Sequence, residues 1–162
     1  SLFDIDISAR AQARASILIS ASREAVWARI SDPETWPDWN RDVEWVGAVG
    51  CVTVGTRFEW RAGGMTIRST VQALDAPSFI GWTGKTTVVS ARHIWRLTAE
   101  GANTRVETAE SFRGAYATLL TGHAKRTIQK ALEQGLADLK SECEDAARVE
   151  LRERCLGLSV PP

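Results

Sequence analysis

The sequence predicts an α+β fold in which one antiparallel sheet packs against a single long helix near the C-terminus. Two observations indicate this class. Residues 43–112 alternate apolar and polar side chains with a period of two and are interrupted by turn sequences, whereas residues 116–144 carry their apolar side chains along one helical face. A strand and two short helices are expected before the alternating region.

The composition is that of one globular domain spanning residues 1–162, with 44% hydrophobic and 25% charged residues. Twenty basic residues balance twenty acidic ones and no basic run is free of acids, so we expect no nucleic-acid partner. No stretch has the apolar length of a transmembrane segment, and the first twenty residues do not resemble a signal peptide. The three cysteines are an odd number without CxxC spacing, which favours a cytoplasmic location.

The N-terminal elements are predicted from local signals. Residues 13–20 alternate like a strand, and Ser20 or Ser22 can cap a short helix whose buried face includes Val26 and Ile30. The stretch DPETWPDWN at residues 32–40 then begins a second short helix. Asp32 is its expected N-cap with Pro33 at the first helical position, and Pro37 is expected to end it.

Turn sequences divide residues 43–112 into an antiparallel meander, at GAVG (47–50), RAGG (61–64), DAPS (75–78) and EGAN (100–103). In an antiparallel hairpin, the residue numbers of any two residues that face each other add up to the same total. Each turn therefore predicts which residues are paired across its two strands. The predicted cross-strand pairs are Phe58 with Ile67 or Ser69, Trp60 with Met65 or Ile67, Val71 with Trp82, Ala73 with Ile80, His93 with Glu110, Trp95 with Thr108, and Leu97 with Val106.

These pairings divide the sheet into an inward face and an outward face, which we expect to meet the long helix and water, respectively. The inward face carries Phe58, Trp60, Ile67, Ser69, Val71, Ile80, Trp82, Val89, His93, Trp95, Leu97, Val106, Thr108, Glu110 and Phe112. The outward face carries Arg57, Glu59, Arg61, Arg68, Gln72, Arg92, Arg96, Arg105 and Glu107.

The long helix is predicted from Tyr116 to about Glu144, because its apolar residues fall within an arc of about 160°. Its expected buried residues are Leu120, Ala124, Ile128, Ala131, Leu132, Gly135, Leu136, Leu139 and Cys143. Residues 145–162 form a C-terminal extension that either continues this helix or frays.

Local sequences that recur together in one superfamily support this arrangement: AVWARISDPETWPDWN (25–40), VGTRFEW (54–60) and RHIWRLTAEGANTRVETAESFRG (92–114). From about Ala13 to Cys143 the chain resembles the START-like, or SRPBCC, superfamily and its bacterial polyketide cyclase/dehydrase-like branch. The resemblance implies the helix-grip fold, in which a curved sheet of about seven strands wraps around the C-terminal helix and encloses a cavity.

His93 and Glu110 are the candidate residues for chemistry, since they are opposed on the inward face beside Trp95 and Thr108. A carboxylate against an imidazole in an apolar cavity can tune a general base or orient a polar group of a ligand. The alternative is a buried structural pair without a chemical role.

A ligand in the cavity would contact the inward face. The predicted ligand-binding residues are Phe58, Trp60, Ile67, Ser69, Val71, Trp82, His93, Trp95, Thr108, Glu110 and Phe112. The tryptophans among them are equally compatible with plain core packing. Trp36 and Trp39 are expected to pack under the terminal helix and close the narrow end of the cavity.

No cofactor and no metal is predicted, because the chain lacks a P-loop, a GxGxxG after a strand and an HExxH motif. Cyclase relatives carry an inward arginine on the strand where this chain has Met65, Ile67, Ser69 and Val71, while Arg68 points outward. The resemblance therefore implies the cyclase fold more directly than cyclase chemistry.

Three functions remain open from the sequence. The first is binding of a small hydrophobic or aromatic molecule, such as a lipid, polyketide or quinone-like compound, by a monomer or weak homodimer. The second is an enzyme of the cyclase or dehydratase type that uses His93 and Glu110. The third is a protein-interaction module of the chaperone-activator type, which would dock through the basic outward face.

Overall fold

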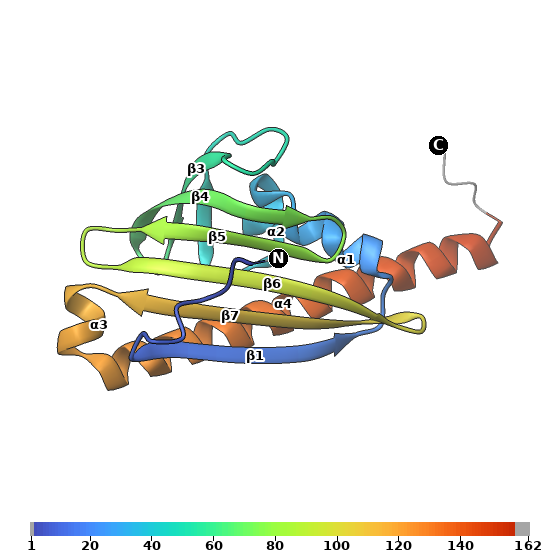
Figure 1. Cartoon of the computed structure of the whole chain (residues 1–162). Coiled ribbons are helices and arrows are strands. Elements are labelled where there is room, and N and C mark those ends of the chain that lie inside the picture. Colours follow the sequence, from blue (N-terminus) through green and yellow to red (C-terminus); the bar gives the residue numbers. More distant parts are fainter. Residues whose placement is uncertain (1, 158–162) are drawn as a thin grey trace.

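A computed structural model describes residues 2–157 of the chain and contains one seven-stranded antiparallel sheet packed against a long helix (Figure 1). The elements in chain order are β1 (Ala11–Ile19), α1 (Arg23–Ile30), η1 (Pro33–Thr35), α2 (Trp36–Trp39), β2 (Val43–Val46), β3 (Arg57–Ala62), β4 (Met65–Asp75), β5 (Phe79–Lys85), β6 (Ser90–Glu100), β7 (Asn103–Arg113), α3 (Ala115–Leu119) and α4 (Thr121–Cys155). This is the predicted helix-grip arrangement.

The six strands β2 to β7 form the expected meander, and β1 adds to the far edge beside β7. Helix α4 runs across the inward face of the sheet (Figure 1). The registers around the 61–64 and 100–103 turns are as predicted, with Trp60 opposite Ile67 and His93 opposite Glu110. In the 75–78 hairpin, Val71 faces Trp82, but a bulge then shifts the register.

Because of that bulge, Ala73 lies opposite Gly81 and not opposite Ile80, so the predicted pairing at this position is wrong. An extra residue in one strand cannot be seen in a turn sequence, since the constant-sum rule assumes an unbroken ladder.

The two short helices form as predicted, but their boundaries differ. The Ser22 hydroxyl accepts a hydrogen bond from the Ala25 amide at 3.2 Å and caps α1. Pro33 begins the 3-10 helix η1, although Asp32 makes no side-chain capping bond. Pro37 does not end the helix: it lies in the first turn of α2, where the missing N–H of a proline has no partner to lose.

The predicted C-terminal helix is broken near its start. Leu120, with φ −128° and ψ 47°, separates α3 from α4, and α4 continues to Cys155, so most of the extension is helical. Leu120 and Ala131 are exposed, which corrects their assignment to the buried face. The buried residues of α4 are Ala124, Ile128, Leu132, Gly135, Leu136, Asp138, Leu139 and Cys143. Residues 158–162 of the predicted extension lie outside the described residues.

Helix α4 is tied to the chain after α2 by Arg41 and Asp138. The Arg41 guanidinium donates to the Asp138 carboxylate at 2.8 Å, and the Arg41 amide donates to its other oxygen at 3.0 Å. Burial acts to raise the pKa of Asp138, but these hydrogen bonds from Arg41 outweigh it and lower that pKa. The pair positions the α2 segment over the sheet.

The outward face of the sheet is not entirely open to water, which corrects the prediction for this face. The segment before β1 crosses it, and Ile5 packs with Phe79, Ile94 and Ala109 in a small apolar cluster. Phe3 lies against Gly81, where an added Cβ would approach the Phe3 ring to 2.5 Å. The sequence interpretation did not assign this segment a place.

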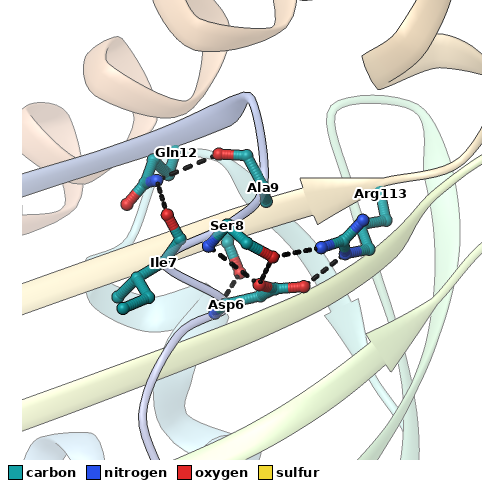
Figure 2. Close-up of polar contacts among 7 residues, drawn as sticks. Asp6, Ile7, Ser8, Ala9, Gln12 and Arg113 are labelled. Carbon is teal, nitrogen blue, oxygen red and sulfur yellow. Dashed lines mark hydrogen bonds and ion pairs between the residues drawn. The ribbon is translucent and has the colours of Figure 1, made fainter.

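A polar turn anchors the segment at the start of β1 (Figure 2). The Asp6 carboxylate accepts hydrogen bonds from the amide and hydroxyl of Ser8 and pairs with the Arg113 guanidinium. The Arg113 hydrogen bond is the main cause that lowers the pKa of Asp6. Gln12 donates to two carbonyl groups of the same turn at 2.8 and 2.9 Å. These contacts join the segment to β7.

Candidate functional site

A small cavity of about 40 Å³ lies between the inward face of the sheet and the α1–α2 region. Its lining residues are Ile30, Trp36, Trp39, Asn40, Val43, Trp60, Trp82, His93 and Trp95. Pockets for drug-sized ligands span roughly 300–1,000 Å³, so this cavity has room for a few water molecules or one polar group. A larger ligand requires the surrounding side chains to move apart.

Four of the predicted ligand-binding residues line this cavity: Trp60, Trp82, His93 and Trp95. Trp36 and Trp39 also line it. That they close its narrow end under the terminal helix stays a prediction. Sequence reasoning missed Ile30, Asn40 and Val43 as lining residues. Of these three, only Ile30 could have been identified from the sequence, because it was predicted on the buried face of the first short helix.

The other predicted residues lie around the cavity or away from it. Phe58 and Val71 are buried in the surrounding core, and Ser69 accepts a hydrogen bond from Trp60 Nε1 at 2.9 Å. Ile67 is half-buried near the end of the β3–β4 hairpin. Phe112 packs in a separate cluster under the start of α4.

Aromatic rings form the wall of the cavity. Trp36 meets Phe58 and Trp60 edge to face, with ring centroids 5.7 and 5.3 Å apart, and lies 5.3 Å from Trp82. The His93 ring is held between Trp82 at 4.8 Å and Trp95 at 5.6 Å. These separations are in the favourable range for aromatic pairs, so each ring fixes its neighbours.

The indole N–H groups around the cavity are unequally satisfied. Trp36 Nε1 donates to the Ile30 carbonyl at 3.1 Å, and Trp60 Nε1 donates to Ser69. Among the described residues, Trp39 Nε1 and Trp95 Nε1 are buried and have no acceptor. A buried donor without a partner costs about 1–3 kcal/mol, so these two N–H groups favour an acceptor in the cavity.

The tautomer of His93 follows from Thr108. The Thr108 hydroxyl donates its only hydrogen to the Ile94 carbonyl at 3.0 Å and lies 2.8 Å from His93 Nε2. Thr108 must therefore accept from His93, which places the imidazole hydrogen on Nε2. His93 Nδ1 is left as an acceptor, and it faces Glu110 Oε1 at 3.7 Å.

Burial sets the protonation of this pair. It raises the pKa of Glu110 to about 8 and lowers the pKa of His93 to about 3, because the charged form of each group is poorly solvated there. At neutral pH Glu110 retains its proton and His93 Nδ1 is unprotonated. The site thus holds a proton donor beside an acceptor without a net charge.

The raised pKa of Glu110 predicts a pH dependence of stability. Between pH 6.5 and 8 the unfolded glutamate is ionised while the folded one is protonated, so stability falls as pH rises. Between pH 4.5 and 6.5 the lowered pKa of His93 gives an opposite slope that cancels this effect, and below pH 4.5 stability falls with falling pH. We expect Glu110→Gln to remove a loss of about 2 kcal/mol between pH 6.5 and 8, measured by urea unfolding.

Glu107→Gln is the matched control, because Glu107 is exposed on the outward face of the same strand. It should keep the slope of the unchanged protein. Equal slopes for Glu110→Gln and Glu107→Gln would show that Glu110 does not hold its proton in the folded state.

The outward face has a wider hollow of about 260 Å³, lined by Arg14, Ala15, Ser16, Ile94, Arg96 and Glu107. Arg14 pairs with Asp4 at 3.4 Å, and Glu107 offsets the remaining charge. Only Ile94 gives it a large apolar side chain. This hollow therefore lacks the apolar lining that a hydrophobic ligand needs.

The outward arginines are mostly engaged within the chain. Arg61, Arg68 and Arg105 pair with Glu44, Glu59 and Glu100, respectively, at 2.9–3.1 Å. Two others stack on rings: Arg92 lies over Phe3 and Arg96 over Phe79. This face consequently adds no support to the interaction-module hypothesis.

Metal ligation has no structural basis among residues 2–157, where no group of three or more His, Cys, Asp or Glu side chains converges. None of the helices in that range is both long and apolar enough to cross a membrane.

The sequence of residues 10–144 matches the profile of the family described as "Polyketide cyclase / dehydrase and lipid transport". The chain belongs to this family. The polyketide cyclase/dehydrase and lipid transport profile covers the sheet and α4 as far as the residue after Cys143, and so includes the whole cavity. No curated protein sequence matches the chain.

Solved structures with the same fold include a hypothetical protein, jhp0584, from Helicobacter pylori, at 14% identity and a TM-score of 0.75 over 85% of this chain and 90% of that one. A START superfamily protein from Mycobacterium smegmatis has 14% identity and a TM-score of 0.73 over 83% and 98% of the two chains. The Zhui aromatase/cyclase from Streptomyces sp. R1128 has 19% identity and a TM-score of 0.63 over 82% and 93%. At these identities the likeness shows the shared fold.

Proposed function

We propose that the chain binds a small hydrophobic or aromatic molecule between the sheet and the helices, with a hydrogen-bond-accepting oxygen of the ligand at the His93–Glu110 end. The observation that carries this proposal is the pair of buried indole N–H groups, on Trp39 and Trp95, that have no acceptor within the described residues. Both tryptophans line the cavity, whose wall is formed mainly by aromatic rings.

The hydrogen-bond donors of the cavity indicate which kind of ligand oxygen can bind there. Trp39 and Trp95 can only donate. Glu110 is not itself a lining residue, but it faces the lining residue His93 at 3.7 Å and carries a proton at neutral pH. A carbonyl of a ketone, ester or quinone matches these donors, which suits a lipid, polyketide or quinone-like compound.

Binding requires the cavity to enlarge. Two lining tryptophans, Trp39 and Trp60, are half-buried, whereas Trp36, Trp82 and Trp95 are buried. Trp60 is held on β3 by its hydrogen bond to Ser69. Trp39 lies on α2, a helix of only four residues. We infer that a ligand enters by displacing Trp39, while the other rings form a fixed platform.

The test compares two ligands that share a ring skeleton and differ by one carbonyl, 9-fluorenone and fluorene, by calorimetric titration. The unchanged protein should prefer the ketone. Trp95→Phe removes the N–H but keeps a ring, and it should weaken binding of fluorenone about tenfold and leave fluorene unchanged. Trp45→Phe is the matched control, since Trp45 is exposed on β2, outside the cavity lining.

Equal affinity for the ketone and the hydrocarbon would overturn the assignment of the polar end. No binding of either compound, together with no copurified small molecule in native mass spectrometry, would overturn ligand binding itself.

The Glu110–His93 pair also favours a second candidate, an enzyme of the cyclase or dehydratase type. A protonated carboxyl with a pKa of about 8 can protonate a carbonyl oxygen. The unprotonated imidazole, which its lowered pKa makes a weak base, can accept a hydrogen bond from the substrate. With a linear poly-β-ketone as substrate, Glu110→Gln should abolish turnover and retain binding. Turnover unaffected by Glu110→Gln and His93→Ala would exclude this candidate.

A further inference from the structure

The charges of this chain are unevenly distributed, although their sum is zero. Two segments, residues 76–99 and 111–132, contain seven of the twenty basic residues and none of the twenty acidic ones. All acidic residues therefore lie in the rest of the chain, which carries the compensating negative charge.

The fold brings parts of these two segments together at one end of the molecule. The β5–β6 loop contacts the start of α3, where the Tyr116 amide donates to the Val88 carbonyl at 3.5 Å. Figure 1 shows α3 and the first turn of α4 as a corner at this end, beyond the ends of β1 and β7. We call this corner the basic tip. It includes Lys85 at the end of β5, Val88 of the β5–β6 loop and the next turns of α4 as far as Lys130.

Apolar side chains project from the basic tip into solvent. Leu119 is 79% exposed, Leu120 is 54% exposed and Val88 is 43% exposed. Leu119 is the last residue of α3, and Leu120, with its non-helical backbone, separates α3 from α4. Adjacent leucines exposed on a corner have no role in the core of this domain.

Four cations belong to the same tip. Lys85, Lys125, Arg126 and Lys130 are exposed, and within residues 2–157 none of them forms an ion pair. Arg113 differs, because it is bound to Asp6. The basic tip thus combines protruding apolar groups with at least four uncompensated positive charges on long, flexible stems.

We infer that the basic tip docks on an anionic lipid bilayer. Leucines that insert at the level of the headgroups and lysines or arginines that remain among the phosphates are the two components of such interfacial binding. This inference goes beyond the proposed ligand site and does not depend on it, since it rests on different residues.

Other occupants fit the basic tip less well. A second copy in a symmetric contact would bring Lys125 and Arg126 against their own counterparts, and like charges oppose that pairing. A nucleic acid would use the cations but leave the leucines in water. An acidic protein would need a concave surface that matches the protruding tip, whereas lipid headgroups can rearrange around it.

The test is cosedimentation of the whole chain with vesicles of phosphatidylcholine containing phosphatidylglycerol, compared with phosphatidylcholine alone. We expect binding to the anionic vesicles at low salt and a strong loss at high salt. Binding to the neutral vesicles should be at least about tenfold weaker.

Two double variants separate the components. Lys125→Glu with Arg126→Glu should weaken binding to anionic vesicles about tenfold or more, and Leu119→Ser with Leu120→Ser should weaken it at both salt concentrations. All four positions are exposed, and unchanged thermal unfolding would show that the variants fold.

Matched controls lie at the other end of α4. Arg148→Glu with Arg152→Glu reverses two exposed arginines, and Val149→Ser with Leu151→Ser removes two exposed apolar side chains. Both should bind vesicles like the unchanged protein. Absence of vesicle binding, equal binding to neutral vesicles, or equal loss in the controls would overturn the inference. Binding to an acidic protein in place of the vesicles would assign the tip to that class of partner and also overturn it.

Discussion

Replacement of Trp36 by alanine should destabilise the protein by about 3–5 kcal/mol, the range for a buried tryptophan whose removal leaves a void. Trp36 is only 5% exposed and contacts three other aromatic rings, so its ring joins α2 to the sheet. Urea unfolding monitored by far-ultraviolet circular dichroism measures the change without dependence on the lost fluorophore.

Trp45→Ala provides the comparison, because it deletes the same side chain at a site that is 46% exposed. We expect it to cost less than about 1 kcal/mol. Similar losses for the two variants would mean that Trp36 contributes hydrophobic surface but no specific packing, and α2 would then not be held by the aromatic cluster.

Gly114→Ala should cost about 3 kcal/mol or more. Gly114 has φ 113° and ψ −175°, a conformation that is essentially restricted to glycine. An added Cβ would also lie 2.5 Å from the Val88 carbonyl oxygen, and a backbone atom cannot move aside as a flexible side chain can. The measurement is the midpoint and slope of urea unfolding.

Gly101→Ala separates the two causes of that loss. Gly101 also has a positive φ, of 62°, but nothing lies within 4 Å of its would-be Cβ. It should cost only about 1–2 kcal/mol, the price of the backbone conformation. If Gly114→Ala cost no more than Gly101→Ala, the close contact between Gly114 and the β5–β6 loop would not exist in solution.

The residues that we expect to matter most for stability lie next to the two proposed functional surfaces. The Trp36 cluster forms the closed wall of the cavity, and Gly114 joins the β5–β6 loop to α3 at the basic tip. A chain that binds a carbonyl-bearing hydrophobic molecule and docks on anionic bilayers would have its ligand site and its docking surface on the same unit. The two proposals are tested by separate measurements.

Much of the candidate site followed from the register of the sheet. Because side chains alternate strictly across a strand, the hairpin turns were enough to place Trp60, Trp82, His93 and Trp95 on one face and to oppose His93 to Glu110. The size of the cavity did not follow from this pattern. Rings from α2 and from the sheet line the space, and their packing depends on contacts between residues far apart in sequence.

Periodicity and turn residues were sufficient to predict an antiparallel sheet against a long helix, the order of the elements and the inward face, because these depend on local backbone preferences and on the separation of apolar from polar groups. The helix-grip fold itself was implied by the resemblance to the START-like superfamily. The three-dimensional arrangement was required for the bulge after Val71, the break at Leu120 and the covering of the outward face by Phe3 and Ile5. It was also required for the unpaired Trp39 and Trp95 donors and for the basic tip, which joins two segments separated in the chain. Each of these features depends on which distant atoms meet, and no local pattern encodes that.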